Sequence, residues 1–272
     1  MPADKRALPE AHSRWSRIWN APGVSTLLSI VVVGALWEVV VRTLMADSLF
    51  IVPLSEIFVE LYVWFSEGTI YPHIWVSGSE FLGGFGLAVV VGIAVGVVMG
   101  FSKGVYVLLN PWVALLYATP LIVMTPFFIL VFGVGISSKV ALAFTVGVFP
   151  VIVNTAAGLR ASEDKYIELA RSFGASPHQM VTKILFPSAV PFILSGLRLG
   201  SGRALMGVVV GEFFISRAGV GFLIAQAAQT FRIGRLFAGV ALFAFAGMGM
   251  FALFDWLERR LTPWRHEVKE EA

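Results

Sequence analysis

Six apolar runs, each about 20 residues or longer, constrain this chain more than any other feature of its sequence. Each is long enough to cross the roughly 30 Å hydrocarbon core of a bilayer as a helix. Hydrophobic residues make up 57% of the 272 residues and charged residues only 14%, which is unlike a soluble domain. We therefore predict an all-α integral membrane protein with about six transmembrane helices, at residues 24–45, 77–101, 107–132, 138–159, 188–214 and 236–258.

The distribution of Lys and Arg orients these spans, because cytoplasmic segments are enriched in both residues. With the N-terminus in the cytoplasm, thirteen of them fall on the cytoplasmic side and five on the outer side. The last outer loop argues the other way, since it carries Arg217, Arg232 and Arg235. We expect a multi-pass protein of a bacterial-type inner (plasma) membrane with both termini cytoplasmic. Its parts would be a tail of 1–23, a transmembrane domain of 24–262 and a tail of 263–272.

The first predicted outer loop contains a segment with one apolar and one acidic side. Ile57, Leu61 and Trp64 share one face of a helix. Three carboxylates occupy the opposite face, those of Glu56, Glu60 and Glu67. This pattern predicts an amphipathic helix that lies at the outer membrane interface.

Glycines recur at four-residue spacing within the predicted spans. Small residues at this spacing let two helix backbones approach closely in lipid. The pattern is compatible with packing inside one helical bundle and with a contact between two subunits. The glycines concerned are Gly92, Gly96 and Gly100 in the second span, and Gly196, Gly200, Gly207 and Gly211 in the fifth.

Residues 160–187 interrupt the apolar chain with a charged and punctuated passage. A first short helix can begin after Ser162, a capping hydroxyl, and end at Gly174, where a left-handed cap fits. The letters SPHQ at 176–179 form a capping box with proline at the first helical position. Pro187 is expected to stop the second helix. Each helix has an apolar face, formed by Tyr166, Leu169, Ala170 and Phe173 and by Met180, Val181, Ile184 and Leu185.

Such a helix pair beside the membrane suits docking to a soluble partner better than a plain connection, which needs no caps and no apolar faces. A DNA-reading role is excluded, because only about 28 residues lie between the spans and they lack a dense basic face. We expect no nucleic-acid partner.

The same passage resembles the EAA loop of ABC importer permeases. The resemblance rests on Glu168-x-Ala170, on Gly174 three residues after Arg171, and on Ile184-x-x-Pro187. It extends over about 50–262, because NPWVALLYATPLIVMTPFFILVFGVG (110–135) and GLRLGSGRALMGVVVGEFF (196–214) resemble permeases for nitrate, sulfonate, taurine and related solutes. Leu169 and Phe186 depart from the family pattern, and both remain apolar.

The resemblance implies the type I ABC importer permease fold, with the loop 160–187 as coupling helices that dock on a cytoplasmic ATPase. The implied coupling residues are Glu168, Ala170, Gly174, Ile184 and Pro187. The implied partners are ABC ATPase subunits that bind ATP and Mg, a second permease copy in a homodimer or a close relative in its place, an extracytoplasmic solute-binding protein and the lipid bilayer. The implied cargo is a small anion-like solute of the nitrate, sulfonate or taurine type.

The sequence itself encodes no catalytic, cofactor or metal chemistry. There is no Cys, and the four His residues show neither helical pairing nor a carboxylate cluster with ligand spacing. The letters GVGISSKV at 133–140 fail as a phosphate loop, because Ser138 replaces its second glycine and Val140 its hydroxyl residue. We therefore expect a protein that is not an enzyme.

Four charged residues inside the predicted spans are functional candidates, because burying a charge in a bilayer costs about 2.5–3.5 kcal/mol on insertion scales. Glu38 lies in the first span, Glu212 near the outer end of the fifth, and Arg198 and Arg203 near its inner end. Either arginine could snorkel, pair within the bundle, or face the pathway and attract an anion. Glu38 is expected to pair with a neighbouring helix.

Two functions remain open at this stage. The first is the membrane-spanning subunit of an ATP-driven importer. The second is a self-sufficient secondary transporter or channel that couples to protons through Glu38 and Glu212, although no inverted repeat supports it. A membrane enzyme lacks any constellation of acid, base, nucleophile or metal ligand.

Overall fold

A computed structural model describes residues 22–45, 48, 50–161, 164–214 and 216–263, with side chains described from residue 25 and, in the helix that begins at Asp164, from residue 168. This part of the chain is helical and contains no strand. Its helices are α2 (Pro22–Leu44), α3 (Leu54–Ser66), α4 (Tyr71–Phe101), α5 (Lys103–Ala118), the 3-10 turn η1 (Leu121–Met124), α6 (Thr125–Phe132), α7 (Ile136–Arg160), α8 (Asp164–Ser172), α9 (Pro177–Met180), the π-helix η2 (Val181–Leu185), α10 (Phe186–Phe214), α11 (Val220–Gln229) and α12 (Ile233–Leu261).

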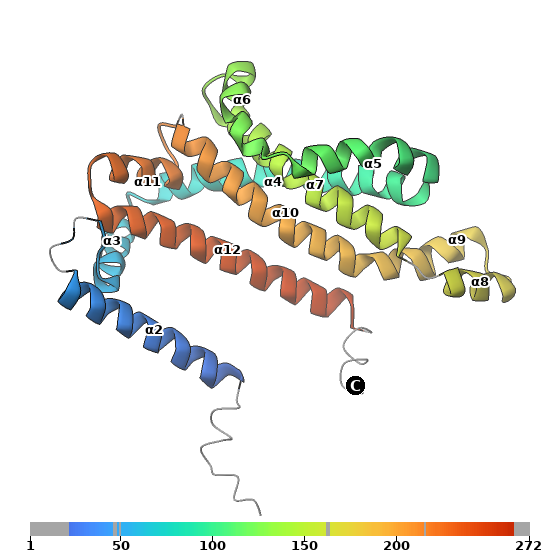
Figure 1. Ribbon diagram of the computed structural model, residues 1–272, viewed down its shortest axis with the longest axis horizontal. Helices are drawn as coiled ribbons and strands as arrows, with labels where there is room; N and C mark the ends of the chain where they lie inside the picture. Colours follow the sequence, from blue (N-terminus) through green and yellow to red (C-terminus); the bar gives the residue numbers. More distant parts are fainter. Residues whose placement is uncertain (1–21, 46–47, 49, 162–163, 215, 264–272) are drawn as a thin grey trace, which may run out of the picture.

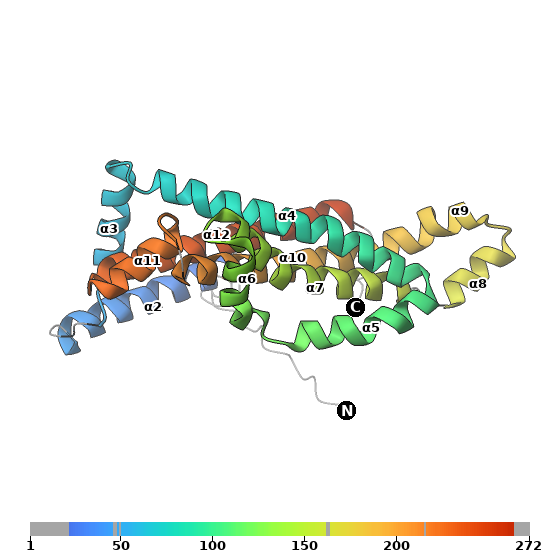
Figure 2. The ribbon, with the colours of Figure 1, turned by 90° about the horizontal axis from the view of Figure 1, so that it is seen from above.

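Five helical segments are long and apolar enough to cross a membrane, and a bent pair brings the number up to six. This confirms the predicted all-α membrane architecture. Figures 1 and 2 show α4, α7 and α10 running side by side, with α12 along α10 and α2 at the margin of the molecule. The short helices α3 and α11 lie at one end, here called the α11 end, and α8 and α9 lie at the other.

The core of the bundle is the contact of α4 and α10 with α7. Gly92 and Gly96 of α4 lie so close to α7 that a Cβ on either would come within 2.7 Å of a side-chain carbon of Val151 or Thr155. On α10, a Cβ on Gly200 would come within 2.8 Å of the carbonyl oxygen of Gly147. Glycine at these positions therefore sets how near the backbones approach.

The glycine pattern is explained by packing within one chain. Gly100 meets Leu159 of α7, and Gly196, Gly207 and Gly211 likewise face residues of α7. The alternative, that these glycines form a contact between subunits, is not needed for any of them. Each of the glycine faces found in the sequence is covered by α7 of the same chain.

The predicted span 107–132 is not one continuous helix. Its first part, α5, ends at Ala118, and the η1 and α6 segment turns away from it by 79°. Pro120 supplies the physical reason, because it has no N–H for a helical hydrogen bond and forces the residue before it out of the helical region. Thr119 accordingly has extended backbone angles, φ −73° and ψ 135°.

The amphipathic segment forms α3, but its apolar face does not lie open to lipid. Ile57, Leu61 and Trp64 are buried against a cluster that includes Val220 of α11 and Ala238 of α12. On its polar side, Glu60 forms an ion pair of 3.2 Å with Arg235 of α12. The predicted amphipathic helix is therefore present, but its apolar face packs on α11 and α12 instead of facing lipid.

We predict that Gly96→Ala lowers the stability of the purified protein. The new methyl group would overlap Thr155 and push α4 away from α7, and overpacking of this kind costs about 1–3 kcal/mol. Gly86→Ala on the same helix is the matched control, because a Cβ there meets nothing within 4 Å. Thermal unfolding in detergent checks the pair. Equal midpoints for both variants would contradict the packing described for α4 and α7.

Candidate functional site

The loop 160–187 forms two helices joined at Gly174. The first, α8, ends at Ser172, and Gly174 has φ +75°, which is the left-handed region that favours glycine. The N–H of Gly174 donates to the carbonyl of Arg171 at 2.9 Å, and that of Ala175 donates to the carbonyl of Ala170 at 3.0 Å. The predicted left-handed cap is confirmed. Its counterpart at the start of α8, Ser162, lies outside the described residues.

The second helix begins with the capping box that the letters SPHQ predict. The N–H of Gln179 donates to Ser176 Oγ at 3.3 Å, and the N–H of Ser176 donates to Gln179 Oε1 at 2.9 Å. Pro177 occupies the first turn, where its missing N–H costs nothing. The direction of the chain after the Gly174 turn is therefore fixed locally.

The expectation that Pro187 stops this helix is wrong. After α9 the chain makes the π-helix η2 and continues without a break into α10, so that Pro177–Phe214 forms one helical segment of 38 residues. The wide π turn replaces the regular hydrogen-bond ladder just before the proline, where its ring would otherwise clash. The second helix of the loop is thus a direct extension of a membrane span.

The loop exposes apolar side chains at the end of the molecule. Both views show α8 and α9 projecting beyond the neighbouring ends of α7 and α10 (Figures 1 and 2). Leu169 on α8 and Phe173 directly after it are 56% and 83% exposed. Glu168 is exposed, whereas Ala170 and Ile184 are half-buried. The residues found by the resemblance therefore lie together, and two large apolar side chains stand beside them.

Arg198 pairs within the bundle. Its Nη2 donates to Asp255 and, at 3.2 Å, to Glu258, both near the end of α12. The pair ties α12 to α10 toward the loop end. Three roles were considered for Arg198 from the sequence: snorkelling, pairing within the bundle, and facing the pathway. The structure shows pairing within the bundle.

Arg203 lies elsewhere, beside the break between α5 and η1. Its guanidinium lies 4.4 Å from the ring centroid of Tyr117 on α5. Both line a cavity of about 280 Å³, together with Thr119, Pro120 and Met206. The arginine is exposed, and no carboxylate lines this cavity. A cation and an aromatic ring thus meet in a hollow at the broken helix.

Glu38 connects α2 to the start of α3. It accepts from Arg42 Nε at 2.6 Å, from Ser55 Oγ at 2.7 Å and from the N–H of Ser55 at 3.1 Å. The sequence predicted a pairing with a neighbouring helix, and this is confirmed. Trp37 adds a second link, since its Nε1 donates to the carbonyl of Val52 at 3.1 Å.

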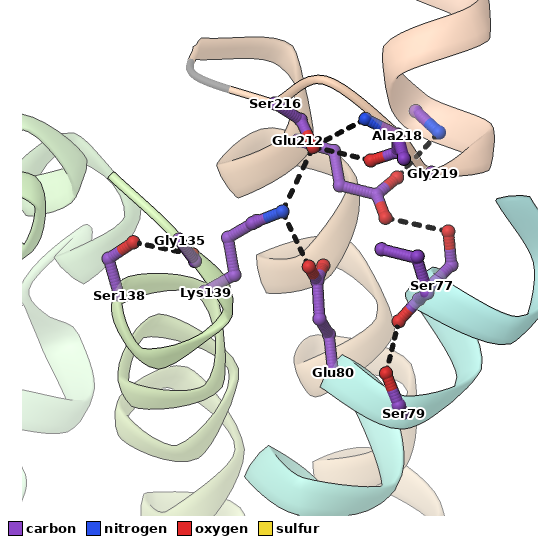
Figure 3. A network of polar contacts seen from close by, with 12 residues as sticks. Ser77, Ser79, Glu80, Gly135, Ser138, Lys139, Glu212, Ser216, Ala218 and Gly219 are labelled. Atoms are coloured by element: carbon purple, nitrogen blue, oxygen red, sulfur yellow. Dashed lines mark hydrogen bonds and ion pairs between the residues drawn. The ribbon is translucent and has the colours of Figure 1, made fainter. Parts of the chain in front are cut away.

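Glu212 is buried near the end of α10, at the α11 end of the molecule (Figure 3). Ser77 Oγ of α4 donates to its Oε1 at 2.6 Å, and the N–H of Gly221 donates to its Oε2 at 2.6 Å. Ser77 Oγ in turn accepts from the N–H of Val220 at 2.9 Å. The carboxyl group therefore joins α10, α4 and the start of α11.

A buried ion pair beside Glu212 escaped the sequence reasoning. Lys139 of α7 and Glu80 of α4 lie 2.5 Å apart, and their side chains are 7% and 0% exposed. Lys139 also donates to Ser216 Oγ at 2.9 Å. The signal was present, because each residue falls just inside a predicted span, 77–101 or 138–159. Opposite charges one turn inside two spans favour an ion pair between them.

These features define a class of protein. The described helices make a bundle that crosses a membrane, with a punctuated helix pair projecting at one end and a broken helix beside a cavity. Within the described residues no group of His, Cys, Asp and Glu could hold a metal ion. The class is an integral membrane protein with a helix pair at one end that suits docking to a soluble partner.

Comparison with known proteins gives the family. Residues 88–264 match the family described as binding-protein-dependent transport system inner membrane component, and the chain belongs to it. The chain is thus the multi-pass inner-membrane permease of a binding-protein-dependent ABC importer, a transport subunit and not itself a catalyst. Membership implies ABC ATPase and binding-protein partners. This favours the importer over the self-sufficient transporter considered from the sequence.

Two curated relatives are similar over most of the chain. The putative aliphatic sulfonates transport permease SsuC of Bacillus subtilis is 34% identical, over 89% of this chain and 88% of its own. The taurine transport system permease TauC of Escherichia coli is 29% identical, over 89% of this chain and 90% of its own. A chain of the inward-facing MetNI methionine ABC transporter has the same fold, with a TM-score of 0.61, 18% identity, and coverage of 70% of this chain and 94% of that one.

We predict that Arg198→Met destabilises the protein while Arg203→Met does not. The first variant leaves two carboxylates of α12 without their guanidinium partner, a loss of about 1–2 kcal/mol because the site is partly exposed. The second removes only a contact with an aromatic ring at an exposed position. Thermal midpoints measured side by side check this. A lower midpoint for Arg203→Met than for Arg198→Met would contradict the assignment.

Proposed function

We propose that this permease carries a small organic anion of the sulfonate class into the cell. The observation that carries the proposal is Arg203, a cation beside Tyr117 in a cavity without a carboxylate. A guanidinium presents several N–H donors in one plane, which suits the oxygens of a sulfonate. The relatives named for aliphatic sulfonates and for taurine support the same class.

The position of Arg203 favours a role in the pathway over a structural one. It makes no ion pair among the described residues, unlike Arg198, which lies one and a half turns away on the same helix. The cavity also lies where the helix formed by α5 is broken, and broken helices line the sites of many transporters. An anion that enters this cavity would meet the guanidinium of Arg203 and no carboxylate.

We further propose that the loop 160–187 is the coupling element, with Glu168, Ala170, Gly174, Ile184 and Pro187 in the roles that the family resemblance implies. Exposed Leu169 and Phe173 suit a partner with an apolar groove. Gly174 sets the angle between the two helices, and the unbroken Pro177–Phe214 segment extends from the loop into the span that carries Arg203. A movement of the ATPase would therefore reach the cavity along one helix.

The working unit in this proposal is a homodimer with its termini in the cytoplasm. The Arg203 cavity lies on an exposed face of α10, which also bears Leu199 and Met206 at helical spacing, and a second copy would enclose it. The start of α2 and the end of α12 both point toward the end of the bundle that bears α8 and α9 (Figure 1). The excess of Lys and Arg on the same side supports this orientation.

Phe173→Ser tests the coupling element. We expect it to weaken recovery of the co-expressed ATPase by about tenfold or more, because burial of a Phe side chain contributes roughly 1.5–3 kcal/mol. The fold should be unaffected, since Phe173 is 83% exposed. Phe231→Ser is the matched control, a Phe that is 71% exposed at the opposite end. Full ATPase recovery with Phe173→Ser would refute this docking surface.

Arg203→Met tests the cargo. In vesicles containing the permease, its ATPase and its binding protein, we expect uptake of a short alkylsulfonate to fall by about tenfold, the loss of one charge-assisted contact worth about 1.4 kcal/mol. Arg203→Lys, which keeps the charge, should retain more uptake. ATPase recovery serves as the assembly control and should stay normal. Wild-type sulfonate uptake by Arg203→Met would remove the proposed pathway role.

A further inference from the structure

The buried network at the α11 end contains more negative than positive charge. Glu80 and Glu212 are 0% and 1% exposed, and Lys139 is 5% exposed. Three helices contribute these groups: α4, α10 and α7. With every group ionised, two carboxylates face one ammonium, and the network carries one unbalanced negative charge. A net charge held away from water in a membrane-spanning bundle is costly, so a further positive charge must enter the site.

Among the residues that the structure describes, no other group beside the network supplies that charge. On α4, His73 Nδ1 lies 3.0 Å from the nitrogen and 3.2 Å from the carbonyl oxygen of Gly219, so its ring is held by the backbone before α11. Arg217, in the loop after α10, is exposed. The segment α11, VGFLIAQAAQ, has no charged residue, and α12 presents Leu242 and Phe243 to the cavity beside Ser77. The net charge of the network is therefore set by the two carboxyl groups and Lys139 alone.

The free hydrogen-bonding capacity of the network is on Glu80. Both of its carboxyl oxygens are buried without a hydrogen-bond partner, apart from the ion pair of Oε1 with Lys139. Both oxygens of Glu212 already accept, from Ser77 and from Gly221. Glu212 is bonded to Ser77, which lies one turn before Glu80 on α4, so the two carboxyl groups belong to the same buried network (Figure 3). A hydrogen atom on one carboxyl group would satisfy an oxygen of the other.

We propose that Glu80 and Glu212 bind one proton between them, so that the network of two carboxyl groups and Lys139 is neutral. The ligand of this site is a single hydron, held as O–H···O between the two carboxyl groups. It serves to close the α11 end, where Glu212 holds the start of α11 and Lys139 holds Ser216. It does not travel with the cargo, and the proposal stands whatever solute the permease carries.

Infrared difference spectroscopy of the purified full chain tests the site in mildly alkaline buffer, where exposed carboxyl groups are ionised. The wild type should show one carbonyl band of a protonated carboxyl group that shifts in D2O. Glu80→Gln and Glu212→Gln should each lose the band, because one carboxylate then balances Lys139. Lys139→Met should increase it about twofold, because both remaining carboxyl groups must then be neutral.

Glu38→Gln is the matched control and should leave the band unchanged, because Glu38 is ionised beside Arg42 and Ser55. Size exclusion and thermal midpoints establish that each variant is folded. If the variants fail to fold, the wild-type spectrum alone decides, since absence of the band overturns the proposal. A band that survives both Gln substitutions also overturns it. A third result would also overturn it: no carbonyl band, together with a thermal midpoint that is higher in sodium than in choline. That result would place a metal cation in the site.

Discussion

The close packing of α4 and α10 on α7 is the constraint on which the other features depend. It requires glycine wherever the backbones meet, as at Gly96 against Thr155 and Gly200 against Gly147. The same approach brings together Glu80, Lys139 and Glu212, one from each helix. Gly211 links the two effects, because a Cβ there would lie 2.9 Å from Cγ of Lys139. Dispersion and close fit, rather than hydrophobic expulsion, stabilise such contacts in lipid.

Outside this trio, polar links near the helix ends add to apolar contacts such as those of α3 with α11 and α12. Arg198 ties the end of α12 to α10, Glu60 ties α3 to Arg235, and Glu38 ties α2 to Ser55. An apolar cavity of about 280 Å³ lies among α4, α10, α11 and α12. A rigid core with lightly attached outer helices can change its packing around the core without losing it, as alternating access requires.

Local sequence signals predicted local structure well. The predictions failed where the structure depends on contacts between residues that are distant in the sequence or on backbone geometry without a sequence pattern. The Gly174 cap and the Ser176 capping box depend on neighbours within a few residues, so the letters alone suffice. The prediction that Pro187 ends the helix was wrong, because the π turn that accommodates this proline has no sequence signature. Pro120 indicates the 79° break, but the length of the apolar run favoured one continuous span over 107–132. The Glu80 and Lys139 pair needs the helix arrangement, which periodicity does not give.

The neutrality of the buried network bears on anion transport through electrostatics. Charges inside a bundle are weakly screened, so an unbalanced carboxylate would repel an anionic cargo over a long range. With its proton in place, the network contributes no net charge, and Arg203 becomes the dominant charge near the broken helix. The Arg198 cluster cannot compete as an attractor, because Asp255 and Glu258 surround its guanidinium. In the proposed pathway an anion therefore meets Arg203, which makes no ion pair among the described residues, while Arg198 and Lys139 are already paired with carboxylates.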